Sequence, residues 1–128
     1  MAKGIKGIDV AGAAELMKAG ALMVDVREGH EYAGARIPGS LNAALSRLEA
    51  VDIPAANNQP IVFFCASGAR TSMNAGRLAT KAGNAEAYVM SGGISAWSRA
   101  GLPVEQGGGN KGQGESGRSQ GFFARLLG

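Results

Sequence analysis

The sequence has little of several residue types that carry chemistry in proteins. Among its 128 residues there is one cysteine and one histidine. A single cysteine cannot form a disulfide within the chain, and one histidine with one cysteine makes a poor metal site. We therefore expect no internal disulfide, no bound metal and no cofactor. A reducing compartment, the cytoplasm, is the simplest assumption.

Long apolar runs and a strong excess of one charge are also missing. No segment approaches the ~20 apolar residues that a membrane-spanning helix needs. Asp9 and several glycines interrupt any apolar N-terminal segment of secretory length, so we expect no export. The net charge is +3, which is too small to indicate a nucleic-acid partner.

The apolar segments that are present predict one α/β domain. Three short runs have the length and composition of buried strands, at 21–26, 61–64 and 87–90. Helical patterns alternate with them, at 11–19, 45–51, 71–82 and 94–100. Strands that are buried on both faces and separated by helices are typical of a mainly parallel central sheet flanked by helices on both faces.

The end of the chain has a different composition. Eight of the 22 residues from 107 to 128 are glycine, and the segment has too few apolar side chains to offset the entropy of ordering. We predict a folded domain at 1–105, a flexible glycine-rich linker at 106–120 and a short amphipathic segment at 121–128. Docking of that segment on a partner, docking on the domain and a frayed end stay open, and membrane contact is not favoured.

The cysteine stands at the end of the run 61–64, in the sequence Cys65-Ala66-Ser67-Gly68-Ala69-Arg70. Sites in parallel sheets lie beyond the carboxyl ends of the strands. Glycine permits a tight loop here, and the other small side chains leave its interior open. Backbone amides around the sulfur would form an anion cradle and lower the pKa of the thiol. The arginine could pair with an oxyanion at the rim.

Taken alone, a cysteine after a strand is often an inert small hydrophobe. The combination of strand, cysteine, glycine-bearing loop, arginine and helix favours a reactive thiolate instead. A persulfide formed on such a thiolate would divide sulfur transfer into two displacements, with no general base required. We expect His30, the one histidine, to be a structural or surface residue.

Over residues 5–104 the sequence resembles the single-domain rhodaneses, which are sulfurtransferases. The resemblance runs through five blocks in family order and spacing, at 22–28, 30–32, 37–42, 65–70 and 92–97. It implies a rhodanese-like fold and a thiosulfate sulfurtransferase activity. Cys65 would take a sulfane sulfur from thiosulfate or a persulfide donor and pass it to cyanide or to a low-molecular-weight or protein thiol. The amides of Ala66 through Arg70 would cradle the persulfide, and Arg70 would steer the donor.

Two departures from the family pattern concern charge. Arg36 stands where many relatives carry a histidine, and it adds a second candidate anion contact. The residues between Cys65 and Arg70 are uncharged, whereas some relatives that use thiosulfate place extra basic residues in or beside this loop. The resemblance therefore does not fix the preferred donor.

Two other functions compete with this interpretation. Cysteine phosphatases and arsenate reductases also close an anion-binding loop with arginine. Such phosphatases place one more residue between cysteine and arginine than the four found here, and the smaller loop suits a terminal sulfur better than a phosphate. A persulfide relay or protein-interaction module with low turnover of small molecules is the other alternative.

Several further residues are given structural roles by the sequence. We expect Asp25, at the end of a strand, to orient Arg27 or to accept loop amides. Arg27 and Glu31 are predicted to form an ion network at the surface or rim, away from the sulfur. Thr71 is predicted to cap the helix after the loop or to reach a bound anion, and Trp97 to pack in the core.

Overall fold

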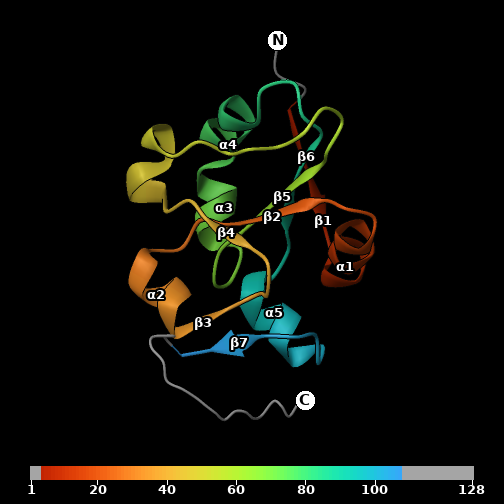
Figure 1. Cartoon of the computed structure of the whole chain (residues 1–128), viewed down its shortest axis with the longest axis vertical. Coiled ribbons are helices and arrows are strands. Elements are labelled where there is room, and N and C mark those ends of the chain that lie inside the picture. Colours follow the sequence, from red (N-terminus) through yellow and green to blue (C-terminus); the bar gives the residue numbers. More distant parts are fainter. Residues whose placement is uncertain (1–3, 108–128) are drawn as a thin grey trace.

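A computed structural model describes residues 4–107 of the chain. Its strands are β1 (Ile5–Ile8), β2 (Leu22–Asp25), β3 (Ala35–Arg36), β4 (Leu41–Asn42), β5 (Ile61–Phe64), β6 (Ala87–Met90) and β7 (Glu105–Gln106). Its helices are α1 (Val10–Lys18), α2 (Gly29–Gly34), the 3₁₀ helix η1 (Leu45–Ala50), α3 (Ala69–Met73), α4 (Ala75–Ala82) and α5 (Gly93–Arg99). Figure 1 traces these elements along the chain.

Five strands form the central sheet in the order β1-β6-β5-β2-β4, and all of their pairings are parallel. The three strands predicted from apolar runs, β2, β5 and β6, lie side by side in the middle of this sheet. A separate two-stranded sheet pairs β3 with β7 in antiparallel register. The mainly parallel sheet predicted from the sequence is confirmed.

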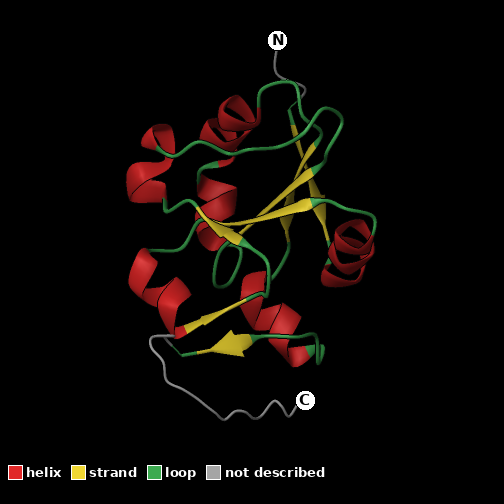
Figure 2. Ribbon diagram, in the orientation of Figure 1, coloured by secondary structure: helices red, strands yellow, loops and turns green. Residues whose placement is uncertain are grey.

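Helices cover both faces of the central sheet because successive residues of a strand point to opposite faces (Figure 2). Val24 and Phe63 pack in one cluster with Leu78 of α4 and Leu48 of η1. The alternate residues of the same strands join a second cluster that includes Ala13 of α1 and Trp97 of α5. Trp97 is 1% exposed, so its predicted place in the core is confirmed.

The helix predicted at 71–82 is two helices in the structure. α3 ends at Met73 and α4 starts at Ala75, and Asn74 between them has the non-helical angles φ −117° and ψ 19°. The side-chain amide of Asn74 donates to the carbonyl oxygen of Arg70 at 2.8 Å. The backbone amide of Asn74 donates to the same carbonyl at 3.1 Å, so the side chain adds a second hydrogen bond at the end of α3.

The described domain continues through β7. Gln106, the first residue of the predicted linker, pairs with Ala35, and the amide of Gly107 donates to the carbonyl of Gly34 at 2.9 Å. The rest of the predicted linker and the amphipathic segment at 121–128 lie outside the described residues. Within residues 4–107, no helix is both long and apolar enough to cross a membrane.

Candidate active site

The carboxyl edge of the central sheet brings together three segments that are distant in sequence. β2 ends at Asp25, β5 at Phe64 and β6 at Met90, and the three strands run in the same direction. Cys65 follows the middle strand of the three. Figure 1 shows the loop after β5 next to α3 and the start of α5.

The loop after Cys65 directs a backbone amide at the sulfur atom. Gly68 has φ +97°, a left-handed conformation that residues with a Cβ rarely adopt. In this conformation its amide donates to Cys65 Sγ at an N···S distance of 3.1 Å. Cys65 itself is 0% exposed, so the sulfur lies at the bottom of the loop rather than at its surface.

The electrostatic balance at the sulfur favours its ionised form. Burial raises the pKa of the Cys65 thiol, because a thiolate loses hydration in apolar surroundings. Backbone amides of Thr71, Gly68 and Ser67, together with the Thr71 hydroxyl, more than reverse this effect and leave the pKa below its ordinary value. Lowered thiol pKa values are typical of nucleophilic cysteines.

Backbone amides at the start of α5 bind carbonyl groups of the cysteine loop. The amides of Ile94 and Ser95 donate to the carbonyl oxygens of Cys65 and Ala66 at 2.9 and 3.0 Å. Gly93 has φ +58°, and a Cβ placed there would lie 2.6 Å from the backbone carbon and oxygen of Ala66. Only a glycine lets the helix approach the loop so closely, because backbone atoms cannot move aside as a flexible side chain can.

Arg70 lies at the rim, but it already has an anionic partner. Its two terminal nitrogens bind the two carboxylate oxygens of Glu31, at 2.9 and 3.0 Å. The Arg70 hydrogen bonds lower the pKa of Glu31 to about 2, which is the largest effect on that carboxyl. The structure therefore places Glu31, from α2, against the arginine of the cysteine loop.

The predicted ion network of Arg27 and Glu31 at the surface is wrong for Arg27. Arg27 is 6% exposed, and its guanidinium binds the fully buried carboxylate of Asp25, with an Nη2···Oδ2 distance of 2.7 Å. Asp25 also accepts the backbone amide of Arg27 at 2.9 Å, which confirms that it orients this residue. The pair is buried because each charge offsets the other and further hydrogen bonds satisfy both.

Arg36 is engaged elsewhere in the fold. Its Nε lies 3.3 Å from the carboxylate of Glu105, and its Nη1 donates to the carbonyl of Gly107 at 3.0 Å. It holds β7 against β3 in this arrangement. His30 is exposed on α2, consistent with its predicted surface role.

Two residues near the cysteine loop, Glu31 and Gly93, were not predicted to contact it, and a third, Thr71, was given two alternative roles. The sequence around Glu31 contains no motif that indicates an arginine partner 39 positions away. Only the fold brings the two residues together. Thr71 was predicted to cap a helix or to reach an anion, and its hydroxyl lies 3.8 Å from Cys65 Sγ. Gly93 belongs to a pair of glycines whose signal in the sequence is a turn, not a contact with the cysteine loop.

Fold and site together define a parallel α/β domain with a thiolate loop at the carboxyl edge of its sheet. The sequence model of the rhodanese-like domain family matches residues 9–100 of the chain. A thiosulfate sulfurtransferase GlpE of Actinobacillus pleuropneumoniae is 31% identical over 90 residues, which cover 67% of this chain and 79% of that protein. The chain belongs to the rhodanese-like family, and its fold is rhodanese-like.

Two further proteins are similar to this chain over different shares of their own length. An uncharacterized protein of Synechocystis, slr1261, is 37% identical over 83 residues, which span 65% of this chain but 46% of that protein. The crystal structure of a rhodanese-related protein from Thermoplasma volcanium superposes with a TM-score of 0.67 at 27% identity, covering 78% of this chain and 97% of that one. Similarity to sulfurtransferases at this level supports the family and leaves the substrates of this chain to be proposed.

Proposed function

We propose that the protein is a sulfurtransferase that carries a sulfane sulfur on Cys65. The thiolate attacks the outer sulfur of thiosulfate, the sulfur–sulfur bond breaks, and sulfite leaves with the bonding electrons. A nucleophile, either cyanide or a thiolate, then attacks the outer sulfur of the resulting persulfide. The Cys65 thiolate leaves and is regenerated. A persulfide donor would enter the same cycle and release a thiol.

The hydrogen bond from the Gly68 amide to Cys65 Sγ is the observation that carries this proposal. A structural cysteine needs no amide aimed at its sulfur, whereas a thiolate is stabilised by one. The lowered pKa of the thiol follows from the same loop. Lowering the pKa of the thiol increases the fraction present as thiolate, and a preformed thiolate needs no general base in either displacement.

The burial of the sulfur restricts what can react with it. With Cys65 at 0% exposure, a donor reaches the sulfur only after atoms at the mouth of the loop move. The side chains of Ala66, Ser67 and Ala69 are short, so small movements suffice for a terminal sulfur atom to enter. We expect slow reaction with bulky alkylating reagents and faster reaction with small sulfane donors.

Steady-state formation of thiocyanate from thiosulfate and cyanide tests the proposal. Varying one substrate at several fixed concentrations of the other should give parallel double-reciprocal lines, as expected for two separate displacements. Cys65→Ser should abolish turnover while its circular dichroism spectrum stays that of the parent. Turnover that survives in Cys65→Ser would refute the assignment of the sulfur carrier.

A further inference from the structure

Apart from Cys65 and Arg70, the cysteine loop carries no charge. Ala66, Ser67 and Ala69 are uncharged, and α5 adds only backbone amides where it meets the loop. Among the described residues hydrogen-bonded to this loop, the charged side chains are those of Arg70 and Glu31, which bind each other. A donor that approaches Cys65 therefore meets a neutral ion pair in place of a cation.

The ion pair has a geometry that is difficult for a second anion to enter. Each terminal nitrogen of Arg70 donates one N–H to Glu31, in the bidentate arrangement that guanidinium and carboxylate groups favour, so a second anion could reach only the remaining N–H groups. Glu31 is also held from its other side, because the backbone amide of Glu28 donates to its Oε1 at 2.9 Å in a capping box. The carboxylate is thus fixed in place, and its lowered pKa keeps it charged at every physiological pH.

Arg27 and Arg36 are not available to bind an anionic donor in place of Arg70, because each already binds a carboxylate. The guanidinium of Arg27 is bound to Asp25 and to the carbonyl oxygen of Ala35. Arg36 is bound to Glu105. Each of these cations has a carboxylate partner of its own, so a dianion that displaced Glu31 would gain Arg70 alone.

We propose that Glu31 sets the donor class of this site by occupying Arg70, so that persulfides are used in preference to the dianion thiosulfate. This inference rests on the proposed function. A persulfide R–S–SH carries no second anionic group that needs a cation. The Cys65 thiolate attacks its outer sulfur, the sulfur–sulfur bond breaks, and RS⁻ leaves with the bonding electrons. The proton remains on the new Cys65 persulfide or passes to the thiolate that leaves.

Glu31→Gln is the variant that isolates the charge. Glutamine also serves at this position of a capping box, so the start of α2 keeps its acceptor for the Glu28 amide. The variant is loaded in single turnovers with thiosulfate and, separately, with the persulfide of 2-mercaptoethanol, which has no other charged group. Loading of Cys65 is followed by intact-protein mass spectrometry. Glu31→Ala is examined in parallel as a second variant.

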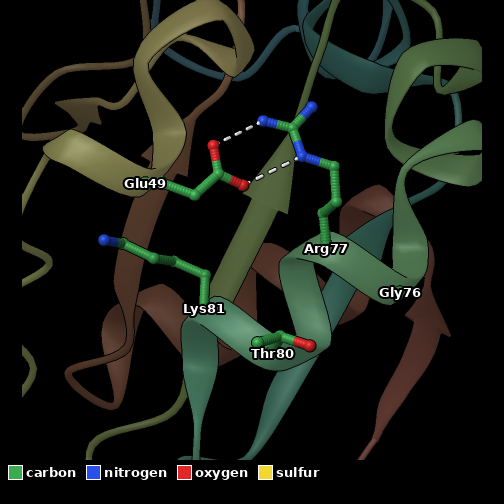
Figure 3. A pocket seen from close by; sticks show the side chains of 5 residues that line it. All are labelled: Glu49, Gly76, Arg77, Thr80 and Lys81. Carbon is green, nitrogen blue, oxygen red and sulfur yellow. Dashed lines mark hydrogen bonds and ion pairs between the residues drawn. The ribbon is translucent and has the colours of Figure 1, made fainter.

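A matched control pair lies outside the cysteine loop, between η1 and α4. Glu49 and Arg77 also form a bidentate pair, with N···O distances of 3.0 and 2.9 Å, beside a hollow lined by these two residues, Gly76, Thr80 and Lys81 (Figure 3). Glu49→Gln removes a similar carboxylate without touching the cysteine loop. It should leave the ratio of the two loading rates unchanged.

We expect Glu31→Gln to raise the ratio of thiosulfate loading to persulfide loading about tenfold, a size suited to releasing one partly exposed bidentate pair. Adding Arg70→Gln to this variant should remove the gain, because the released cation is then absent. An unchanged or lowered ratio in both Glu31 variants would overturn the inference and show that Glu31 only positions Arg70. Failure of the parent protein to load from either donor would instead contradict the proposed function.

Discussion

The hydroxyl oxygen of Thr71 lies 3.8 Å from Cys65 Sγ and 3.1 Å from the carbonyl oxygen of Gly68, and its one proton can be donated to either acceptor. One side chain thus contacts the sulfur and also fixes the glycine whose amide binds that sulfur. Thr71 is 1% exposed, so the sulfur is in contact with this hydroxyl and not with bulk water on that side. This arrangement makes Thr71 part of the electrostatic environment of the thiolate.

Thr71→Val should raise the pKa of the Cys65 thiol, because it removes the hydroxyl and keeps the shape of the side chain. Persulfide loading at pH 7 should fall by roughly three- to tenfold, because a smaller fraction of the thiol is then ionised. The pKa is measured from the ultraviolet absorbance of the thiolate as a function of pH. Thr71→Ser retains the hydroxyl and should stay close to the parent, and equal effects of the two substitutions would contradict this role.

Gly93→Ala should destabilise the domain by about 2–4 kcal/mol, because its Cβ would overlap backbone atoms of the cysteine loop. Gly101→Ala is the control: Gly101 also has a positive φ, of +79°, but a Cβ there has nothing within 4 Å. Gly101→Ala should lower the free energy of unfolding by only about 1–2 kcal/mol, the cost of placing an alanine in the left-handed conformation. Urea unfolding measures both values. If the two variants lose the same stability, α5 does not press on the loop as described.

Asp25→Asn should be strongly destabilising, since it leaves the guanidinium of Arg27 buried without its carboxylate. Breaking a buried pair in this way typically costs about 3–5 kcal/mol. Glu15→Gln, at an exposed pair with Lys18, should leave the unfolding midpoint unchanged. Urea denaturation of the three proteins decides the matter, and a stable Asp25→Asn would mean that water reaches Arg27.

The Glu31–Arg70 pair should make stability depend on acid pH. The pKa of Glu31 is lowered in the folded state to about 2 from its ordinary value of 4.5, so the folded protein binds this proton less readily than the unfolded chain. The stabilisation is fully present above pH 4.5 and is lost as the pH falls towards 2. It amounts to about 1 kcal/mol after allowing for solvent screening at the partly exposed pair.

Urea unfolding of the parent and of Glu31→Gln between pH 7 and about pH 2 measures this contribution. The difference in stability between the two proteins should shrink as the pH falls through this window. A difference that stays constant down to the lowest pH would mean that the pair adds no charge-dependent stability.

The central strands could be predicted from the sequence because their apolar runs are short, continuous and bounded by turns. β5 and β6 have the predicted bounds, and β2 is one residue shorter at each end. The helix break at Asn74 could not be predicted, because a single residue leaves helical angles inside a pattern that is helical on both sides. Helix propensity over 71–82 does not distinguish one helix from two.

Only the part of the site that is formed by consecutive residues could be predicted from the sequence. The loop from Cys65 to Arg70 is local, so its small residues and its glycine predict its shape directly. Glu31 meets Arg70 only because β2 and β5 are neighbours in the sheet, and a long-range contact of this kind leaves no local pattern. The buried state of Arg27 was missed because an arginine in a charged cluster reads as a surface residue.

Every step proposed for this site requires Cys65 to hold one transferable sulfur atom. Intact-protein mass spectrometry after brief exposure to thiosulfate or to a small persulfide measures this. The mass should increase by about 32 Da, the mass of one sulfur added as a persulfide; cyanide should remove the addition, and Cys65→Ser should never acquire it. No gain of sulfur by the parent protein from either donor, or an adduct that persists in Cys65→Ser, would show that Cys65 is not the sulfur carrier.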